Sequence, residues 1–217
     1  KEFHQFGILT PNDKENESNV STIQVIFMGS HPVQSHIAQL LSSDANYQLN
    51  HYPKTEVFFQ QANTILAQEK GIRTILIHAH DYYRHDDYLQ IHRWCQQNNI
   101  PWLPIYHEGK SVYIGPVFSS NTIDYFSAHQ RRLACTLYSH ALELYYEDIS
   151  QQTQQLPLPP VRPANISAIA CALLNLLDQA NTPSALPQLV GTQFALDIPS
   201  NEIQTHTILP LPPAPHG

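Results

Sequence analysis

The sequence predicts an α/β fold in which a mainly parallel, Rossmann-like sheet is covered by helices on both faces. The first observation is that short β-branched, apolar runs alternate with amphipathic stretches between about residues 22 and 106. The second is a Glu-Gly turn at 108–109 with a β pattern on each side, which predicts an antiparallel hairpin at the sheet edge. The third is size, because 217 residues that are 42% hydrophobic suffice for one core with a small appendage.

Four strands and three helices are expected before the hairpin is complete. Runs of β-branched and apolar residues predict the strands, and apolar residues at helical spacing predict the helices. The strands are expected at 22–29, 47–52, 73–80 and 100–106, and the helices at 32–43, 55–71 and 86–99. The first helix should bury Val33, Ile37, Leu40 and Leu41 along one stripe.

The second half of the chain is expected to complete the same domain. After the hairpin partner at 110–118, the pattern predicts one long helix from about Ile123 to about Glu147. Residues 155–164 form a proline-rich crossing, a buried helix follows at 164–180, and 187–217 hold two short strands and a tail. We therefore expect one domain over 21–217, with 1–20 as the remnant of a preceding domain and a linker.

Composition excludes several classes of function. A net charge of −7 and a pI near 6.0 give no electrostatic footprint for nucleic acid or anionic lipid. No apolar stretch approaches the roughly 20 residues of a membrane span, and no secretory signal is present, so we expect a cytoplasmic protein. Cys95, Cys135 and Cys171 are odd in number and scattered, which indicates reduced, buried thiols.

The first strand-to-helix turn is where an α/β fold of this kind binds a nucleotide. Such a site needs the pattern G-x-G-x-x-G, because only glycine lets the backbone approach a phosphate. Here Gly29 keeps the first position, whereas His31 and Gln34 occupy the other two and would intrude on the phosphate. The sequence therefore favours a plain buried turn over a dinucleotide or ATP site, and no cofactor is expected.

A run of ligand-type side chains at 78–87, "HAHDYYRHDD", is the main candidate for metal chemistry. His78 and His80 would share one face of a strand, and further potential ligands extend to His92. The alternative is that a strand end emerging into solvent carries polar residues anyway. No G-x-S-x-G nucleophile motif is present, and no catalytic residue is assigned.

Three local phrases, in order, resemble one known family. They are "NNIPWLPIYHEGKSVYIGPVF" (98–118), the following stretch to Arg132, and "HTILPLPPAPHG" (206–217). They are similar to ThiF-like proteins, related to ubiquitin-activating enzymes, that partner YcaO cyclodehydratases in making azole- and azoline-modified ribosomal peptides of the bacteriocin type. In that family the second phrase carries C-x-x-C followed by an arginine, and the third ends in C-P-x-C.

The resemblance implies a zinc site whose ligands are missing here. The four family cysteines would bind one structural zinc, and their positions correspond to Tyr125, Ala128, Ala214 and Gly217. Because all four are replaced, no metal is expected. Tyr125 and Phe126 would fill the space with apolar area, and the C-terminal tail would pack beside them.

The resemblance also implies a role. The chain would be a non-catalytic scaffold that dimerises, presents a precursor peptide and activates a YcaO enzyme that makes azolines from Cys, Ser or Thr. In the family a winged-helix domain that binds the leader peptide precedes the ThiF-like part. Two alternatives stay open: a metal-dependent hydrolase or transferase that uses the His78/His80 region, and an adenylating ThiF-type enzyme with an atypical nucleotide loop.

Overall fold

One seven-stranded sheet organises the chain in the computed structural model, which describes residues 22–29, 31–42, 44–68, 73–119, 122–151, 161–181 and 191–209. The strand order is β2-β1-β3-β4-β5-β6-β7. The strands are β1 (Ile23–Met28), β2 (Tyr47–Tyr52), β3 (Arg73–His80), β4 (Trp102–Glu108), β5 (Ser111–Ile114), β6 (Thr192–Asp197) and β7 (Glu202–Thr207). The pairings from β2 to β4 are parallel, and those from β4 to β7 are antiparallel. The predicted α/β fold, with its parallel core, antiparallel hairpin and C-terminal β extension, is confirmed.

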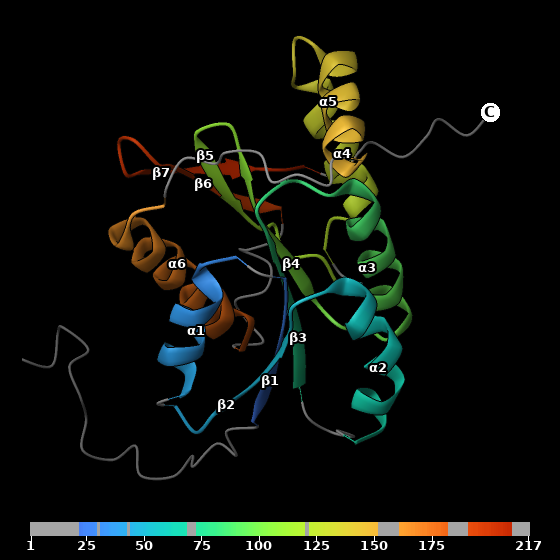
Figure 1. Cartoon of the computed structure of the whole chain (residues 1–217), viewed down its shortest axis with the longest axis vertical. Coiled ribbons are helices and arrows are strands. Elements are labelled where there is room, and N and C mark those ends of the chain that lie inside the picture. The colour runs from blue at the N-terminus through green and yellow to red at the C-terminus, as the bar shows by residue number, and fades with distance from the viewer. Residues whose placement is uncertain are drawn as a thin grey trace, which may run out of the picture.

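Helices cover both faces of the sheet (Figure 1). On one face lie α1 (Val33–Ser42) and α6 (Pro163–Asn181), and on the other lie α2 (Thr55–Gln68), α3 (His85–Gln97) and α4 (Tyr125–Ala134). Helix α5 (Ser139–Gln151) continues beyond α4 at the top of the view. None of the helices within the described ranges is long and apolar enough to cross a membrane.

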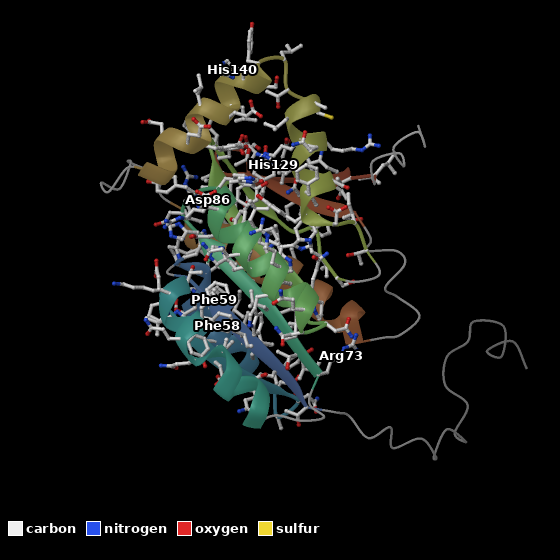
Figure 2. All side chains as sticks on the ribbon, turned by 90° about the vertical axis from the view of Figure 1, so that its right-hand side faces the viewer. Phe58, Phe59, Arg73, Asp86, His129 and His140 are labelled. Carbon is white, nitrogen blue, oxygen red and sulfur yellow. The ribbon has the colours of Figure 1, made fainter. Side chains whose placement is uncertain are left out.

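Both faces of the central strands are buried, which explains their continuous apolar sequence. In β1, Val25 and Phe27 join the core beneath α1 and α6, whereas Ile26 and Met28 join the core beneath α2 and α3. Figure 2 looks onto this second face, where Phe58 and Phe59 of α2 are labelled; Phe58 packs edge-on against Trp94 of α3 at 4.9 Å between ring centroids. Strand β7 differs, since all six of its residues are exposed.

Two details of the helices differ from the sequence prediction. The single helix expected from Ile123 to Glu147 is wrong, because α4 ends at Ala134 and α5 begins at Ser139. The break has a local cause: the Thr136 hydroxyl donates to the carbonyl of Arg132, and the Thr136 N–H to that of Leu133, which closes the helix. Leu40, expected in the buried stripe of α1, is 43% exposed.

Candidate functional site

The first strand-to-helix turn is closed by the side chain of His31. Its Nδ1 accepts a hydrogen bond from the Val33 N–H at 3.1 Å, and its carbonyl accepts the Gln34 N–H at 3.0 Å. Two of the amides that could face a phosphate at the start of α1 are therefore engaged within the turn. The Gln34 side chain is only half-buried and lies beside the turn, whereas His31 is fully buried.

Gly29 is required by a close approach between two strands. Its φ is +106°, and a Cβ added there would lie 1.9 Å from the carbonyl oxygen of Ala79 on β3. The glycine that the sequence placed at the first position of a nucleotide loop thus has a packing reason of its own.

His31 bonds across the sheet end to His107 of β4, with 2.8 Å between the two Nε2 atoms. Burial, with nearby His107 and His80 adding to it, lowers the pKa of His31 to about 3. Burial also lowers the pKa of His107 to about 4. Both imidazoles are therefore neutral at pH 7, and they form a buried hydrogen bond where the parallel strands end.

The structure brings His78 and His80 together but separates the rest of the 78–92 cluster. The two rings stack with 6.0 Å between centroids, His78 is fully buried against Tyr88, and His80 Nε2 contacts Arg84 at 3.2 Å. His92 instead accepts the Trp102 indole N–H at 3.2 Å. Within the part of the chain that the structure describes, no three His, Cys, Asp or Glu side chains form a group that could hold a metal ion.

The family resemblance places zinc ligands at four positions of this chain. The two that lie within the described residues, Tyr125 and Ala128, are at the start of α4. Asp124 caps this helix by accepting the Ser127 N–H at 2.9 Å. Tyr125 and Ala128 are buried, at 2% and 7% exposure, in a cluster of aromatic rings. Ala214 and Gly217 lie outside the described residues. The expectation that Phe126 also fills this space is wrong: it is 57% exposed, because adjacent helical residues point in different directions.

A hydrogen-bonded network surrounds Tyr125, and the sequence did not indicate it. The Tyr125 hydroxyl lies 2.6 Å from that of Tyr83 and 2.8 Å from His85 Nδ1, and the Tyr83 hydroxyl lies 2.8 Å from His129 Nδ1. The His85 and His129 rings stack with 4.1 Å between centroids. Burial, with His85 adding to it, lowers the pKa of His129 to about 4, so the network is uncharged at pH 7.

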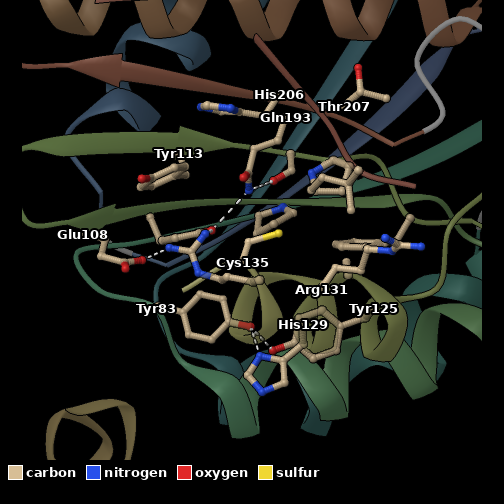
Figure 3. Close-up of a pocket in the computed structure, with 18 of the residues that line it drawn as sticks. Tyr83, Glu108, Tyr113, Tyr125, His129, Arg131, Cys135, Gln193, His206 and Thr207 are labelled. Atoms are coloured by element: carbon tan, nitrogen blue, oxygen red, sulfur yellow. Dashed lines mark hydrogen bonds and ion pairs between the residues drawn. The ribbon is translucent and has the colours of Figure 1, made fainter. Parts of the chain in front are cut away.

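A cavity of about 540 Å³ lies between this network and the antiparallel half of the sheet (Figure 3). Aromatic rings, α4 and the end of β7 line it. Its size is within the range of small-molecule sites. Among its lining residues are Tyr106, Tyr113, Tyr125, Arg132, His206 and Thr207.

Arg132 is the buried charge beside this cavity. It forms an ion pair with Glu108 and donates to the hydroxyls of Tyr146 and Tyr106 at 2.7 and 2.8 Å. Its guanidinium lies 4.8 Å from the Tyr113 ring centroid. The sequence marked this arginine only through the family resemblance, and its partners come from three distant segments.

The cysteines divide differently from the prediction. Cys95 is buried in α3, and burial raises the pKa of its thiol. Cys135 and Cys171 are exposed, so the expectation that all three thiols are buried is wrong. Cys135 lies after the last turn of α4, where the expected continuous helix ends, and it lines the cavity.

Comparison with solved structures finds several chains with a similar fold. The chain is similar to one chain of the E. coli microcin synthetase McbBCD complex, with a TM-score of 0.62 and 13% identity over 94% of this chain and 72% of that one. It is also similar to the heterocyclase TruD, with a TM-score of 0.56 and 13% identity over 87% of this chain and 26% of that one. E. coli MccB, solved with MccA, gives a TM-score of 0.55 and 11% identity over 89% and 66% of the two chains.

These similarities establish the fold, at identities too low to establish a family. The chain spans about a quarter of the length of TruD, at 26%. No family model matches the sequence, and no curated protein sequence matches it.

Proposed function

We propose that the chain is a non-catalytic partner subunit of a peptide heterocyclase, or cyclodehydratase. In this proposal it holds a precursor peptide and activates a YcaO enzyme that converts Cys, Ser or Thr side chains to azolines. Its fold is similar to chains from heterocyclase and microcin synthetase structures, and the motif order resembles the ThiF-like partners. A two-fold homodimer is part of the same proposal.

The observation that carries the non-catalytic assignment is the side chain of His31. An adenylating enzyme of this fold needs free backbone amides at the start of its first helix. His31 covers that helix start, accepts the Val33 N–H and bonds to His107. We infer that Gly29, His31 and Gln34 form a structural turn and that ATP binds to the YcaO partner instead.

The proposal includes the absence of a zinc site. Tyr125 and Ala128 present an aromatic ring and a methyl group where the resemblance would place two thiolates. We infer that Tyr125 and its hydrogen-bonded neighbours stabilise this region in place of a metal, with Ala214 and Gly217 as the other two replaced positions.

Reconstitution tests this function directly. The purified chain would be combined with a YcaO enzyme and a Cys-, Ser- and Thr-rich precursor peptide encoded beside it, and ring formation would be followed as the loss of about 18 Da per azoline. We expect cyclisation to require both proteins and ATP. Equal cyclisation without this chain would reject the partner role.

Two controls address the alternative functions. Calorimetric titration of the chain alone with ATP should give no binding at micromolar concentrations; binding together with ATP–pyrophosphate exchange would favour the adenylating alternative. A hydrolase or transferase that uses His78 and His80 would instead show activity that a chelator abolishes and added zinc restores.

A further inference from the structure

Strand β7 is an edge strand of the sheet, and among the described residues no strand pairs with its outer side. In an antiparallel ladder, successive residues alternate between bonding to one neighbour and to the other. The Ile208 N–H donates to the carbonyl of Gly191, and the Ile198 N–H donates to the carbonyl of Lys110 at 2.9 Å. With the strand registers, these two bonds show which residues of β6 bond to β5 and which bond to β7. It follows that even-numbered residues of β7 bond to β6, whereas Ile203, Thr205 and Thr207 direct their N–H and C=O groups away from the sheet.

Within the described residues, this edge carries little of the usual protection against strand pairing. Natural edge strands commonly carry charged side chains, above all lysine, or proline or a bulge, and Glu202 is the one carboxylate of β7. Strand β7 reads "EIQTHT", pairs with β6 in unbroken register over all six residues and is exposed throughout. Within the described ranges, no residue bonds to the outward backbone groups of Ile203, Thr205 or Thr207.

The cavity adjoins this open edge. His206 and Thr207 lie on one side of it and α4 lies on the opposite side (Figure 3), and Ile208 and Leu209 are also among its lining residues. Gln193, the register partner of His206 on β6, is buried and bonds to the Tyr106 hydroxyl at 3.2 Å. The even-numbered side chains of β7 therefore share the sheet face that looks toward α4, and a strand added beside β7 would project alternate side chains over the same space.

We propose that β7 binds an extended peptide segment as an eighth strand and that the cavity takes one aromatic or large aliphatic side chain of that segment. An extended peptide offers the alternating N–H and C=O groups that can pair with the edge. The tyrosine-lined cavity of about 540 Å³ has ample room for one large apolar side chain. This inference rests on the proposed function in one respect, since it makes the precursor peptide the natural occupant.

A second copy of the chain fits this site less well. If two β7 strands paired with each other, the side chains over the α4 face would be Glu202, Gln204 and His206 of the other copy. None of these is a large apolar group, so the cavity would stay unfilled.

Fluorescence anisotropy of the purified chain with a labelled heptapeptide, TVTFTVT, tests the proposal. We expect saturable binding, which should weaken by about tenfold or more when the phenylalanine is replaced by alanine. The variant TVPFPVT, whose prolines remove backbone donors, should not bind. Absence of binding by TVTFTVT at millimolar concentration, or equal binding of all three peptides, would overturn the proposal.

Protein variants locate the site. Thr205→Pro removes an outward N–H without removing a bond to β6, whereas Thr205→Val keeps that N–H and is the matched control. Thr205→Pro should abolish binding at an unchanged melting temperature, and Thr205→Val should retain it. Ala128→Phe places a ring in the cavity. This variant should weaken binding of the phenylalanine peptide and leave binding of the alanine peptide unchanged. Binding that Thr205→Pro does not change, or a dimer that this variant alone dissociates, would overturn the proposal.

The assay needs neither ATP nor the cyclodehydratase, so the two proposals can fail separately. If the chain binds TVTFTVT but cyclisation proceeds equally without the chain, the proposed function is rejected and the edge site stands. Cyclisation supported equally by the Thr205→Pro variant and the unchanged chain would reject the edge site and leave the proposed function standing.

Discussion

The Nε2 atoms of His31 and His107 lie 2.8 Å apart, although the two histidines are 76 positions apart in the sequence. Because His31 Nδ1 accepts the Val33 N–H, the proton of neutral His31 is on Nε2 and is donated to His107. His107 then carries its own proton on Nδ1, which is buried and has no hydrogen-bond partner within the described residues. The two hydrogen bonds, from Val33 to His31 and from His31 to His107, therefore define one tautomer for each ring. They also connect the start of α1 to β4.

Acid should destabilise the protein through its buried histidines. The pKa values of His31 and His78 are lowered from 6.5 to about 3, and those of His80 and His107 to about 4, chiefly by burial. Between about pH 6.5 and pH 4 the unfolded chain binds protons at these sites while the folded chain does not. The contribution of these groups to the free energy of unfolding should therefore be constant above pH 6.5 and should fall as the pH decreases below that value. Urea denaturation at several pH values measures this loss.

His78→Leu should reduce that acid sensitivity. Both ring nitrogens of His78 are buried without a partner within the described residues, so an apolar side chain of similar volume should raise the free energy of unfolding at pH 7 by about 1–2 kcal/mol. The slope below pH 6.5 should decrease by up to about 1.4 kcal/mol per pH unit, the value for one proton. His140→Gln is the matched control, because the His140 side chain is 84% exposed. A slope that is the same in both variants would contradict the assignment.

Tyr125→Phe should destabilise the protein, whereas Phe126→Ala should have little effect. The first change removes a hydroxyl that lies within 2.8 Å of both Tyr83 and His85, so we expect a loss of about 1–2 kcal/mol. The second removes a ring that is 57% exposed, with an expected change below about 0.5 kcal/mol. Urea denaturation at pH 7 measures both. A larger loss at Phe126 would mean that Phe126, not Tyr125, fills this region.

The parallel core could be predicted from the sequence because its signals are local. Buried strands such as Ile23–Met28 are apolar at every position, and the intervening helices carry clear amphipathic stripes. The break after Ala134 was missed because Thr136 and Cys135 fit an apolar helical pattern, and the hydrogen bonds that close the helix depend on the side chain of Thr136.

The candidate site was harder to predict because its contacts join distant segments. Tyr83, Tyr125 and His129 meet through the packing of α4 against the loop before α3, and no spacing in the sequence encodes that. The sequence shows that His31 stands in the turn, but the bond from His31 to His107 depends on how β4 lies against the first turn, which no local pattern encodes. The run at 78–92 left metal binding open as an alternative, and its spacing does not show that strand alternation and helix packing bring its members against different neighbours.

Metal analysis should find well below one zinc ion per purified chain. Tyr125 and Ala128 cannot supply thiolate ligands, and Ala214 and Gly217 carry no side-chain donor for zinc. Inductively coupled plasma mass spectrometry after dialysis against metal-free buffer measures the content. About one zinc ion per chain would contradict the prediction, and His78→Leu would then test whether the histidine region holds it.

Removing one partner of the ion pair between Arg132 and Glu108 should be among the most destabilising single substitutions outside the apolar core. Arg132 connects α4 to β4 through Glu108 and Tyr106 and to α5 through Tyr146, with a side chain only 17% exposed. Removing one partner of such a pair leaves the other charge buried, so Arg132→Met should cost about 3 kcal/mol or more. Arg132→Lys should recover only part of this loss, because an ammonium cannot reach three acceptors in a planar fork.

Arg93→Met, on the exposed face of α3, is the control and should change stability by less than about 0.5 kcal/mol. In a double-mutant cycle by urea denaturation, Arg132→Met and Glu108→Gln should be non-additive by at least about 1 kcal/mol; additive effects would show that the tyrosine hydroxyls, not Glu108, hold this arginine.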